Sequence, residues 1–579
     1  MTCVISLLII AALWIPGLAV VHYFAPRLRP EHTFVFAPAV SIVLYSVGGI
    51  AGWLYPAQFP WISWTWVGGC TLIGLTVLSF RRALGALRTL DPILPAGYLV
   101  LVLFATQLTL LPIQIPKVFP FPLNLLYWVP KDLLSVRIQA LHHELPIDNL
   151  ISYRFADLMR RGVDFRAPRE FGCGDRPAIA PGQHITARTP LMALVGVHFM
   201  TMFGPSTPVD HMPDKMLDIN SDAAYVPFYL AGACLNALAI LPAYLLGLHL
   251  FGRRAGRLAL LLLAANYGMI LQTDYIWPKA LAGYFAGLFA YAVICGCTRY
   301  SILGSLASLS YYSHPCGTGL VLGCALYHVL SQPRRMRAAL QLVPAGLFAA
   351  VLLVPWHLWA IMWLRTPGNL ISQNIGQSLD QGYLMAANIR LMNVLRTVVP
   401  HLICPDPALN IINLARDSFF TLPGMLGLVL VPFFGASLAQ RRNVLITLTM
   451  GLVPLLMTGA IMGESHGGLA PFGPFLFIPI AATLSAGMLA SLSRWQLLGI
   501  TLACLGEQAI VIWLSAYGPH WQLVSIRDQN TVIRLIALFA VQGSLAGMLT
   551  LVCLRHRAEA AWPVISDSVD RPIAARQAA

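Results

Sequence analysis

Charged residues are scarce in this chain of 579 residues, where Asp, Glu, Lys and Arg together make up 10%. Soluble globular proteins carry about 25%, so an ordinary soluble fold is excluded. Hydrophobic residues make up 58%, and the mean hydropathy is +0.71. Apolar windows of about 20 residues, the length that a helix needs to cross a bilayer, recur along nearly the whole chain. We therefore predict an all-α polytopic membrane protein, since the alternation of period two that a membrane barrel requires is absent.

Metal-binding patterns are also absent. The 11 cysteines form no Cys-x-x-Cys pair and no His/Cys ligand spacing, and most fall in apolar segments as small core residues. No metal site is predicted, and no prosthetic group is expected. Cys173 and Cys404 lie in two long loops expected outside, so they either pair as a disulfide or stay free thiols. No Asn-x-Ser/Thr sequon occurs, which favours a bacterial inner membrane over a eukaryotic secretory one.

Positive charge is in excess, with 37 Lys and Arg against 23 Asp and Glu and a net charge of +14. Most basic residues form short clusters at the ends of apolar segments, which is typical of cytoplasmic loops and argues against a nucleic-acid partner. No basic residue precedes the first apolar segment, whereas Arg27 and Arg29 follow it. We interpret this segment as an uncleaved helix with its N-terminus outside. The polar tail from Glu559 to Ala579 is then cytoplasmic.

The apolar segments and basic clusters together predict five divisions of the chain. Residues 1–92 form three transmembrane helices, near 4–24, 34–54 and 62–80. Residues 93–364 form the core, with an outer loop at 116–221 and helices near 94–115, 225–250, 258–272, 279–297 and 339–364. A second outer loop spans 365–420, C-terminal transmembrane helices span 421–558, and the cytoplasmic tail spans 559–579.

The regular alternation of spans is interrupted between residues 300 and 331. Arg299 and the cluster Arg334, Arg335 and Arg337 should both face inside, so the chain between them must enter the membrane and return. Roughly 30 residues are too few for two full spans, because each needs about 20. We predict a re-entrant hairpin of two short helices that meet at Tyr311–Pro315. Irregular backbone at membrane depth must be buried or line a wet cavity, so this turn should point at a cavity.

The most charge-dense stretch runs from Tyr127 to Asn149 in the first outer loop. Four apolar residues recur there at helical spacing: Leu134, Ile138, Leu141 and Leu145. Two prolines flank them, the first suited to a first helical turn and the second to a helix end. We predict an amphipathic helix at the outer membrane surface, with Asp132 just above the lipid. The alternative is that Asp132 is only an acidic residue favoured by the positive end of this helix.

A second polar element of the same loop is Gly174–Pro177, where Asp175 and Arg176 place a carboxylate beside a guanidinium. A carboxylate can take a proton from an attacking hydroxyl, and Arg or Lys can hold a phosphate leaving group. The pair therefore suits transfer from a phosphate-linked donor. The alternative is a set of surface ion pairs on an outer cap.

This arrangement resembles the GT-C superfamily of membrane glycosyltransferases, which take a sugar from a polyprenyl-phosphate donor. In these enzymes a long first outer loop follows a membrane helix and carries an Asp or Glu soon after it. The segment 94–115 is similar to that helix, and Asp132 matches the acidic position. Trp277-Pro278-Lys279, Ser313-His314-Pro315 and Gly174–Pro177 resemble pieces of uncharacterised bacterial GT-C-like proteins. The chain departs from the pattern in its three preceding helices and in lacking an Asp-x-Asp motif, so dependence on a divalent cation stays open.

The resemblance implies a catalytic base at Asp132 and a set of substrate-binding residues. The latter are Lys131, Arg137, Asp148, Asp175, Arg176, Lys279, His314, Glu464 and His466. Lys279 is either a phosphate contact or a lysine that extends to the membrane interface. His314 either binds substrate or satisfies backbone groups freed by Pro315. Glu464 and His466 either complete the cavity or belong to a solvated loop.

The resulting expectation is a hexosyl- or pentosyltransferase. It would move a sugar from a polyprenyl-phosphate donor to a lipid or cell-envelope polysaccharide acceptor on the outer face, with membrane lipids as further partners. The alternatives are a polytopic transporter or lipid flippase, and a noncatalytic partner of envelope polysaccharide assembly. Transporters often show interrupted helices in two related halves, whereas only one interrupted hairpin is evident here.

Overall fold

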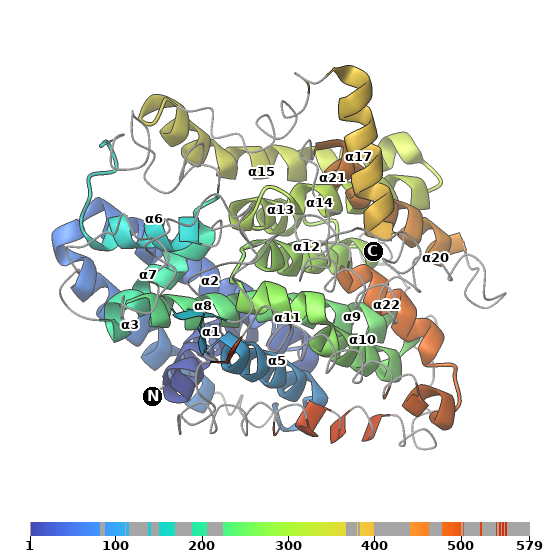
Figure 1. Cartoon of the computed structure of the whole chain (residues 1–579), viewed down its shortest axis with the longest axis horizontal. Coiled ribbons are helices and arrows are strands. Elements are labelled where there is room, and N and C mark those ends of the chain that lie inside the picture. Colours follow the sequence, from blue (N-terminus) through green and yellow to red (C-terminus); the bar gives the residue numbers. More distant parts are fainter. Residues whose placement is uncertain are drawn as a thin grey trace, which may run out of the picture.

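The computed structural model is a bundle of helices (Figure 1). It describes residues 2–80, 87–109, 112–114, 137–139, 150–167, 188–204, 224–365, 379, 382–398, 441–461 and 478–499, with short pieces between 502 and 552. Statements about the structure concern these residues.

Three long helices begin the chain: α1 (Thr2–Phe24), α2 (Pro30–Leu54) and α3 (Phe59–Phe80). A short 3-10 turn, η1 (Pro56–Gln58), joins the last two. Gly17 lets α1 approach α2 closely, because a Cβ there would collide with the backbone of Ala37. The Gly17 amide donates to Ser41 Oγ across this contact, at 2.9 Å. The two helices therefore form a tightly packed pair.

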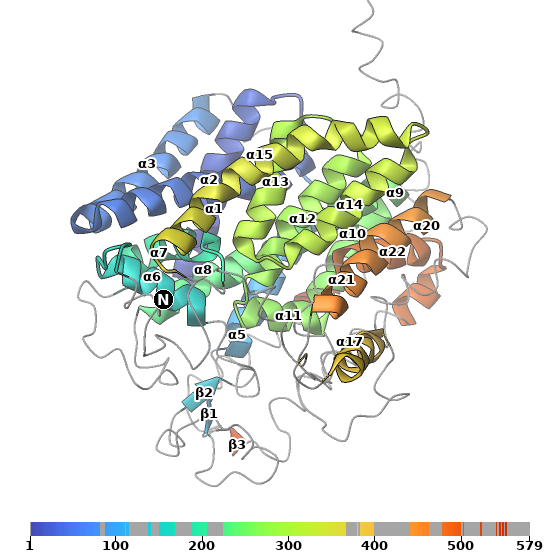
Figure 2. The ribbon, with the colours of Figure 1, turned by 90° about the horizontal axis from the view of Figure 1, so that it is seen from above.

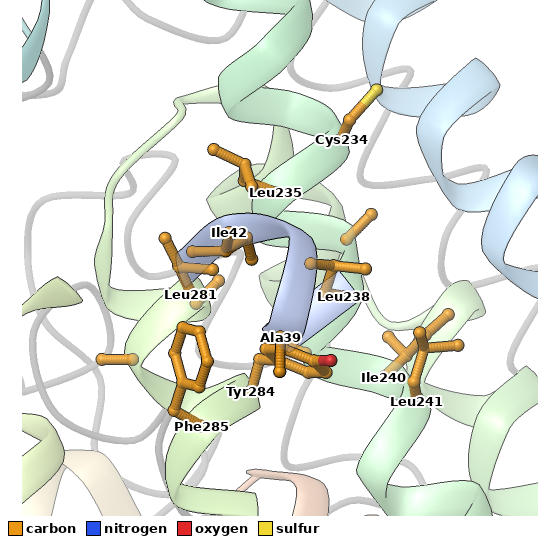
Figure 3. Close-up of a cluster of buried hydrophobic side chains, with 14 of the residues drawn as sticks. Ala39, Ile42, Cys234, Leu235, Leu238, Ile240, Leu241, Leu281, Tyr284 and Phe285 are labelled. Carbon is orange, nitrogen blue, oxygen red and sulfur yellow. The ribbon is translucent and has the colours of Figure 1, made fainter. Parts of the chain in front are cut away.

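The core is built from shorter helices. In chain order they are η2 (Leu87–Thr89), α5 (Ile93–Thr109), α6 (Leu150–Arg160), α7 (Leu191–Phe203), α8 (Tyr225–Ala237), η7 (Leu238–Ile240), α9 (Leu241–Phe251), α10 (Arg253–Ala265), α11 (Tyr267–Asp274) and α12 (Lys279–Ile294). Every residue from Lys279 to Val293 of α12 is buried, so this helix lies at the centre. Figure 3 shows Ala39 and Ile42 of α2 among side chains of α8, η7, α9 and α12.

The predicted re-entrant hairpin is present as two short helices, α13 (Tyr300–Ser313) and α14 (Gly317–Ser331). They meet at His314, Pro315 and Cys316, as the charge pattern indicated. The long helix α15 (Arg335–Met362) follows and packs along α13 (Figure 2). Later elements are α17 (Tyr383–Val398), α20 (Arg441–Ile446), the π-helix η9 (Thr447–Leu452), α21 (Val453–Ile461) and α22 (Ile478–Leu489).

Six described helical segments are long and apolar enough to cross a membrane: Val4–Phe24, Pro30–Leu54, Pro56–Ser79, Tyr225–Phe251, Arg335–Met362 and Arg441–Ile461. In α15 only 11% of the most apolar window is buried, and Leu340, Leu347 and Val351 are among its exposed residues. A soluble protein would not expose so continuous an apolar surface. The fold is therefore that of a polytopic helical membrane protein, as predicted.

A small sheet departs from the all-α prediction. The strands β1 (Pro112–Gln114), β2 (Arg137–Gln139) and β3 (Gln522–Leu523) pair antiparallel in the order β2-β1-β3, with Ile113 opposite Ile138. The predicted surface helix is therefore wrong over residues 137–139. Apolar Val136 and Ile138 alternate there with polar residues, a period that fits a strand as well as a helix. The rest of 127–149 lies outside the described residues.

The predicted outer loop 116–221 contains two helices, α6 and α7. α7 is apolar, is buried along Leu191–Met200, and packs against α2 and α8. Its 13 residues are fewer than the roughly 20 of a full span, so hydropathy alone does not separate this helix from the loop. The division of the chain at residues 92, 364, 420 and 558 stays a prediction.

Candidate functional site

The α11–α12 corner, residues 274–279, has an unusual backbone. Asp274 ends α11 and Lys279 begins α12, and between them Ile276 has a φ of +50°. A β-branched residue rarely adopts positive φ, because its Cβ crowds the backbone. Such strain persists only where the surrounding structure holds it, and it is concentrated at functional sites. This corner is therefore the first place to look for a site.

Asn236 of α8 holds the corner in place. Its side-chain nitrogen donates to the carbonyl oxygens of Gln272 and Trp277, both at 2.9 Å. Its side-chain oxygen accepts from the amide of Leu281 at 3.2 Å. Gly232, one turn earlier on α8, leaves room for Ile276, since a Cβ on Gly232 would lie 3.0 Å from that side chain. One buried amide thus fixes the end of α11, the turn and the start of α12.

Lys279 is buried, with a relative exposure of 2%. Its Nζ lies 3.4 Å from the centroid of the Trp277 ring, a cation–π contact. The edge of Trp277 in turn meets Tyr275, at a centroid distance of 5.0 Å. A lysine that extends to the interface keeps its ammonium in water, whereas this one does not. Its burial argues against that alternative, and a phosphate contact stays a proposal.

His314 is also buried, with 2% exposure, in the turn between α13 and α14. Its Nδ1 accepts a hydrogen bond from the amide of Cys316 at 3.2 Å, so the proton of a neutral ring lies on Nε2. Nε2 is buried and has no hydrogen-bond partner among the described residues. The histidine therefore satisfies a backbone group near Pro315 and also presents a donor that none of the described residues accepts.

Arg188 joins these two residues, although it was not among the predicted site residues. It is buried just before α7, and the positive charges of Arg188 and Lys279 both act on His314 and on Cys316. We call Arg188, Lys279 and His314 the basic group. Residues 188, 279 and 314 come from three separate parts of the chain. The signal available in the sequence was Arg188-Thr189-Pro190 immediately ahead of an apolar run.

An acidic side of the site comes from the other end of the corner. The Asp274 carboxylate is fully buried and accepts a hydrogen bond from the Tyr229 hydroxyl at 3.2 Å. Its charge also acts on Tyr225, whose buried hydroxyl has no hydrogen-bond partner among the described residues. We call Asp274, Tyr229 and Tyr225 the acid–tyrosine group. The sequence analysis did not place these residues in the site.

Most of the predicted site residues lie outside the described residues: Lys131, Asp132, Asp148, Asp175, Arg176, Glu464 and His466. Arg137 lies in β2, where only its backbone is described. Cys173 and Cys404 are also outside, so their pairing stays open. Within the described part of the chain, no group of three or more His, Cys, Asp or Glu residues could hold a metal ion.

A second polar cluster joins α5, α9 and α10. Asp91, fully buried just before α5, accepts hydrogen bonds from Arg257 (2.7 Å), Tyr244 (2.8 Å) and Arg253 (3.1 Å). Burial opposes ionisation of Asp91, but the hydrogen bonds and charges of these partners outweigh it, so the pKa of the carboxyl lies below its usual value. We assign this cluster a structural role, because each of its polar contacts joins neighbouring helices.

Comparison with family models and with curated proteins finds no match. Among solved structures, the chain is similar to the oligosaccharyltransferase of Archaeoglobus fulgidus in its apo form, with 14% identity and a TM-score of 0.40. The alignment covers 78% of this chain and 55% of that one, so this chain spans about half the length of that enzyme. At this level of similarity, no activity, substrate or residue role is carried over.

Proposed function

We propose that this chain is a membrane glycosyltransferase of the GT-C kind. It moves a hexose or pentose from a polyprenyl-phosphate donor to a lipid or cell-envelope polysaccharide acceptor on the outer face of a bacterial inner membrane. The observation that carries the proposal is the basic group, in which Arg188, Lys279 and His314 are each buried and the charges of Arg188 and Lys279 both act on His314.

An anion is the natural ligand of such a group. Arg188 and Lys279 both place positive charge near one buried imidazole, that of His314. Positive charge attracts a phosphate, and Lys and Arg can form charge-assisted hydrogen bonds with it. The Nε2 of His314 adds a buried donor without a partner among the described residues. A polyprenyl phosphate supplies a phosphate together with a lipid tail, and the tail suits the exposed apolar surfaces of the helices.

The same group suits the leaving group of the proposed reaction. Transfer forms a bond between the acceptor hydroxyl oxygen and the anomeric carbon and breaks the bond between that carbon and a phosphate oxygen, so the departing phosphate gains negative charge. Cations already in place stabilise that charge without reorganisation. The acceptor hydroxyl loses its proton to a base, for which we propose Asp132.

The position of Asp132 in the sequence supports this assignment. Asp132 lies five residues before β2, and β2 pairs with β1, which follows α5. Figure 2 shows this sheet beyond the C-terminal end of α5, on the side of the molecule where α11 lies. The other predicted contacts, Lys131, Arg137, Asp148, Asp175, Arg176, Glu464 and His466, remain part of the proposal on sequence grounds alone.

The test is a transfer assay with purified protein in lipid nanodiscs. A polyprenyl phosphate carrying a radiolabelled sugar is the probe, and release of free polyprenyl phosphate in the presence of membrane-extracted acceptor is the readout. We expect Lys279→Met to lower kcat/KM by about 100-fold or more. The matched control is Arg337→Met, which removes an exposed positive charge on α15. Asp132→Asn should abolish release while the protein stays folded.

Two other outcomes separate the alternatives. Movement of the labelled donor between leaflets of proteoliposomes, without release of polyprenyl phosphate, identifies a flippase or transporter. A protein that neither releases polyprenyl phosphate nor moves the donor, and that binds the donor no more tightly than bulk lipid, has the role of a noncatalytic partner. This outcome overturns the proposal.

A further inference from the structure

We infer that the acid–tyrosine group recognises the sugar of the donor, with Tyr225 as a specificity-determining residue. This inference rests on the proposed function, because it assigns the phosphate of the same ligand to the basic group. It adds a second subsite, made of a carboxylate and a phenolic hydroxyl that can bind the hydroxyl groups of a sugar.

The Tyr225 hydroxyl is the observation from which the inference starts. It is 2% exposed and has no hydrogen-bond partner among the described residues. A buried hydroxyl without a partner costs about 1–3 kcal/mol, and the described residues give no reason to keep it. The ring is held edge-on to Tyr153, at a centroid distance of 5.1 Å, and beside Tyr229, at 6.1 Å. Neighbouring rings therefore fix the direction of this hydroxyl.

Asp274 makes the surroundings of that hydroxyl suitable for a sugar. The carboxylate is buried, is bonded to the Tyr229 hydroxyl and acts electrostatically on Tyr225. A carboxylate accepts hydrogen bonds from sugar hydroxyls, while a tyrosine hydroxyl both donates and accepts. A sugar hydroxyl could thus bond to both at once. Asp274 would repel an anionic group of the ligand. We therefore assign the neutral part of the ligand to the acid–tyrosine group.

The α11–α12 corner carries one residue of each subsite, Asp274 at the end of α11 and Lys279 at the start of α12. Asp274 and Lys279 are five residues apart, a span of at most about 18 Å even for extended chain, and here the chain turns between them at Ile276. Asn236 fixes both flanks of this turn. A sugar phosphate likewise has a charged part, the phosphate, attached directly to a neutral part that is rich in hydroxyl groups, the sugar. The corner therefore matches a sugar phosphate better than a bare lipid phosphate.

The test compares affinities for bare and glycosylated carriers. Short-chain polyprenyl phosphate and its glucosyl, galactosyl, mannosyl and arabinosyl derivatives are titrated against the full chain in nanodiscs. We expect the wild type to bind at least one glycosylated carrier about tenfold more tightly than the bare one. In Tyr225→Phe that preference should disappear, while affinity for the bare carrier is unchanged and thermal stability is unchanged or higher, because none of the described residues bonds to the lost hydroxyl.

The matched control is Tyr284→Phe on α12, because its buried hydroxyl donates to the carbonyl of Val35 at 2.7 Å. That variant should lose stability and keep the sugar preference, which is the reverse of Tyr225→Phe. Equal affinity of the wild type for bare and glycosylated carriers overturns the inference, as does a preference that survives in Tyr225→Phe. In either case tight binding of the bare carrier leaves the proposed phosphate site standing. Failure of every carrier to bind overturns the proposed function itself.

Discussion

The side-chain amide of Asn236 donates to the carbonyl of Trp277 at 2.9 Å, two residues before Lys279. This bond and its two companions tie α8 to the α11–α12 corner and hold a β-branched residue at positive φ. The position of Lys279 therefore depends on a side chain 43 residues earlier in the chain.

Replacing Asn236 by Ala should destabilise the protein and displace Lys279. Two buried carbonyls and one amide lose their partner, and each such loss costs about 1–3 kcal/mol. We expect the unfolding free energy in mixed micelles to fall by about 3 kcal/mol or more. Asn266→Ala is the control, because its side chain makes one hydrogen bond, to the amide of Met269. Equal losses in the two variants would show that Asn236 has no special part in holding the corner.

Gly232→Ala should impair donor binding although it improves the helix. Alanine favours an α-helix over glycine by about 1 kcal/mol, but this Cβ would lie 3.0 Å from the Ile276 side chain and push on the corner. We expect weaker binding of polyprenyl phosphate with little change in thermal stability. Gly346→Ala on α15 is the control, since nothing lies within 4 Å of the added Cβ. Unchanged binding in Gly232→Ala would show that the corner adjusts freely.

The Asp91 cluster predicts a defined pH dependence. The folded pKa of Asp91 is depressed, so its stabilising contribution is present above the unfolded pKa of about 3.9 and is lost as pH falls through the lower folded value. At pH 7, Asp91→Asn should lower the unfolding free energy by about 3–5 kcal/mol, because two arginines lose their carboxylate. The difference from wild type should shrink only below about pH 4. Asp164→Asn, at an exposed ion pair with Arg166, should show no measurable change, and a constant difference from pH 7 to pH 3 would contradict the assignment.

Ligand binding should protect Cys316 from alkylation. This half-buried thiol follows the His314 turn, and the charges of Lys279 and Arg188 act on it. A phosphate held by the basic group should therefore slow its reaction with a maleimide, measured by peptide mass spectrometry. Cys70 on α3, also half-buried, should react at the same rate with and without polyprenyl phosphate. Equal rates at Cys316 in both conditions would place the phosphate elsewhere.

Several helices of this protein follow from local sequence. Apolar length and the placement of basic residues predicted α1, α2, α3, α12 and α15 within a few residues of their observed ends. The spacing of charges also predicted the hairpin of α13 and α14, because two spans do not fit between Arg299 and Arg334. The prediction of a helix was wrong at 137–139, because the alternation of apolar and polar residues there fits either a strand or a helix. Pairing with β1 makes this segment a strand.

Hydropathy and charge spacing predicted the class of molecule, a polytopic helical membrane protein, and identified Lys279 and His314 as polar residues in apolar surroundings. Hydropathy and charge are properties of single segments, so they can be read without a partner. Only the tertiary structure brought Arg188 to those two residues, set Asp274 beside Tyr225 and Tyr229, and tied the corner to Asn236. These contacts join segments that are distant in the chain. They depend on how the helices pack against one another, and the sequence of a single segment does not encode that packing.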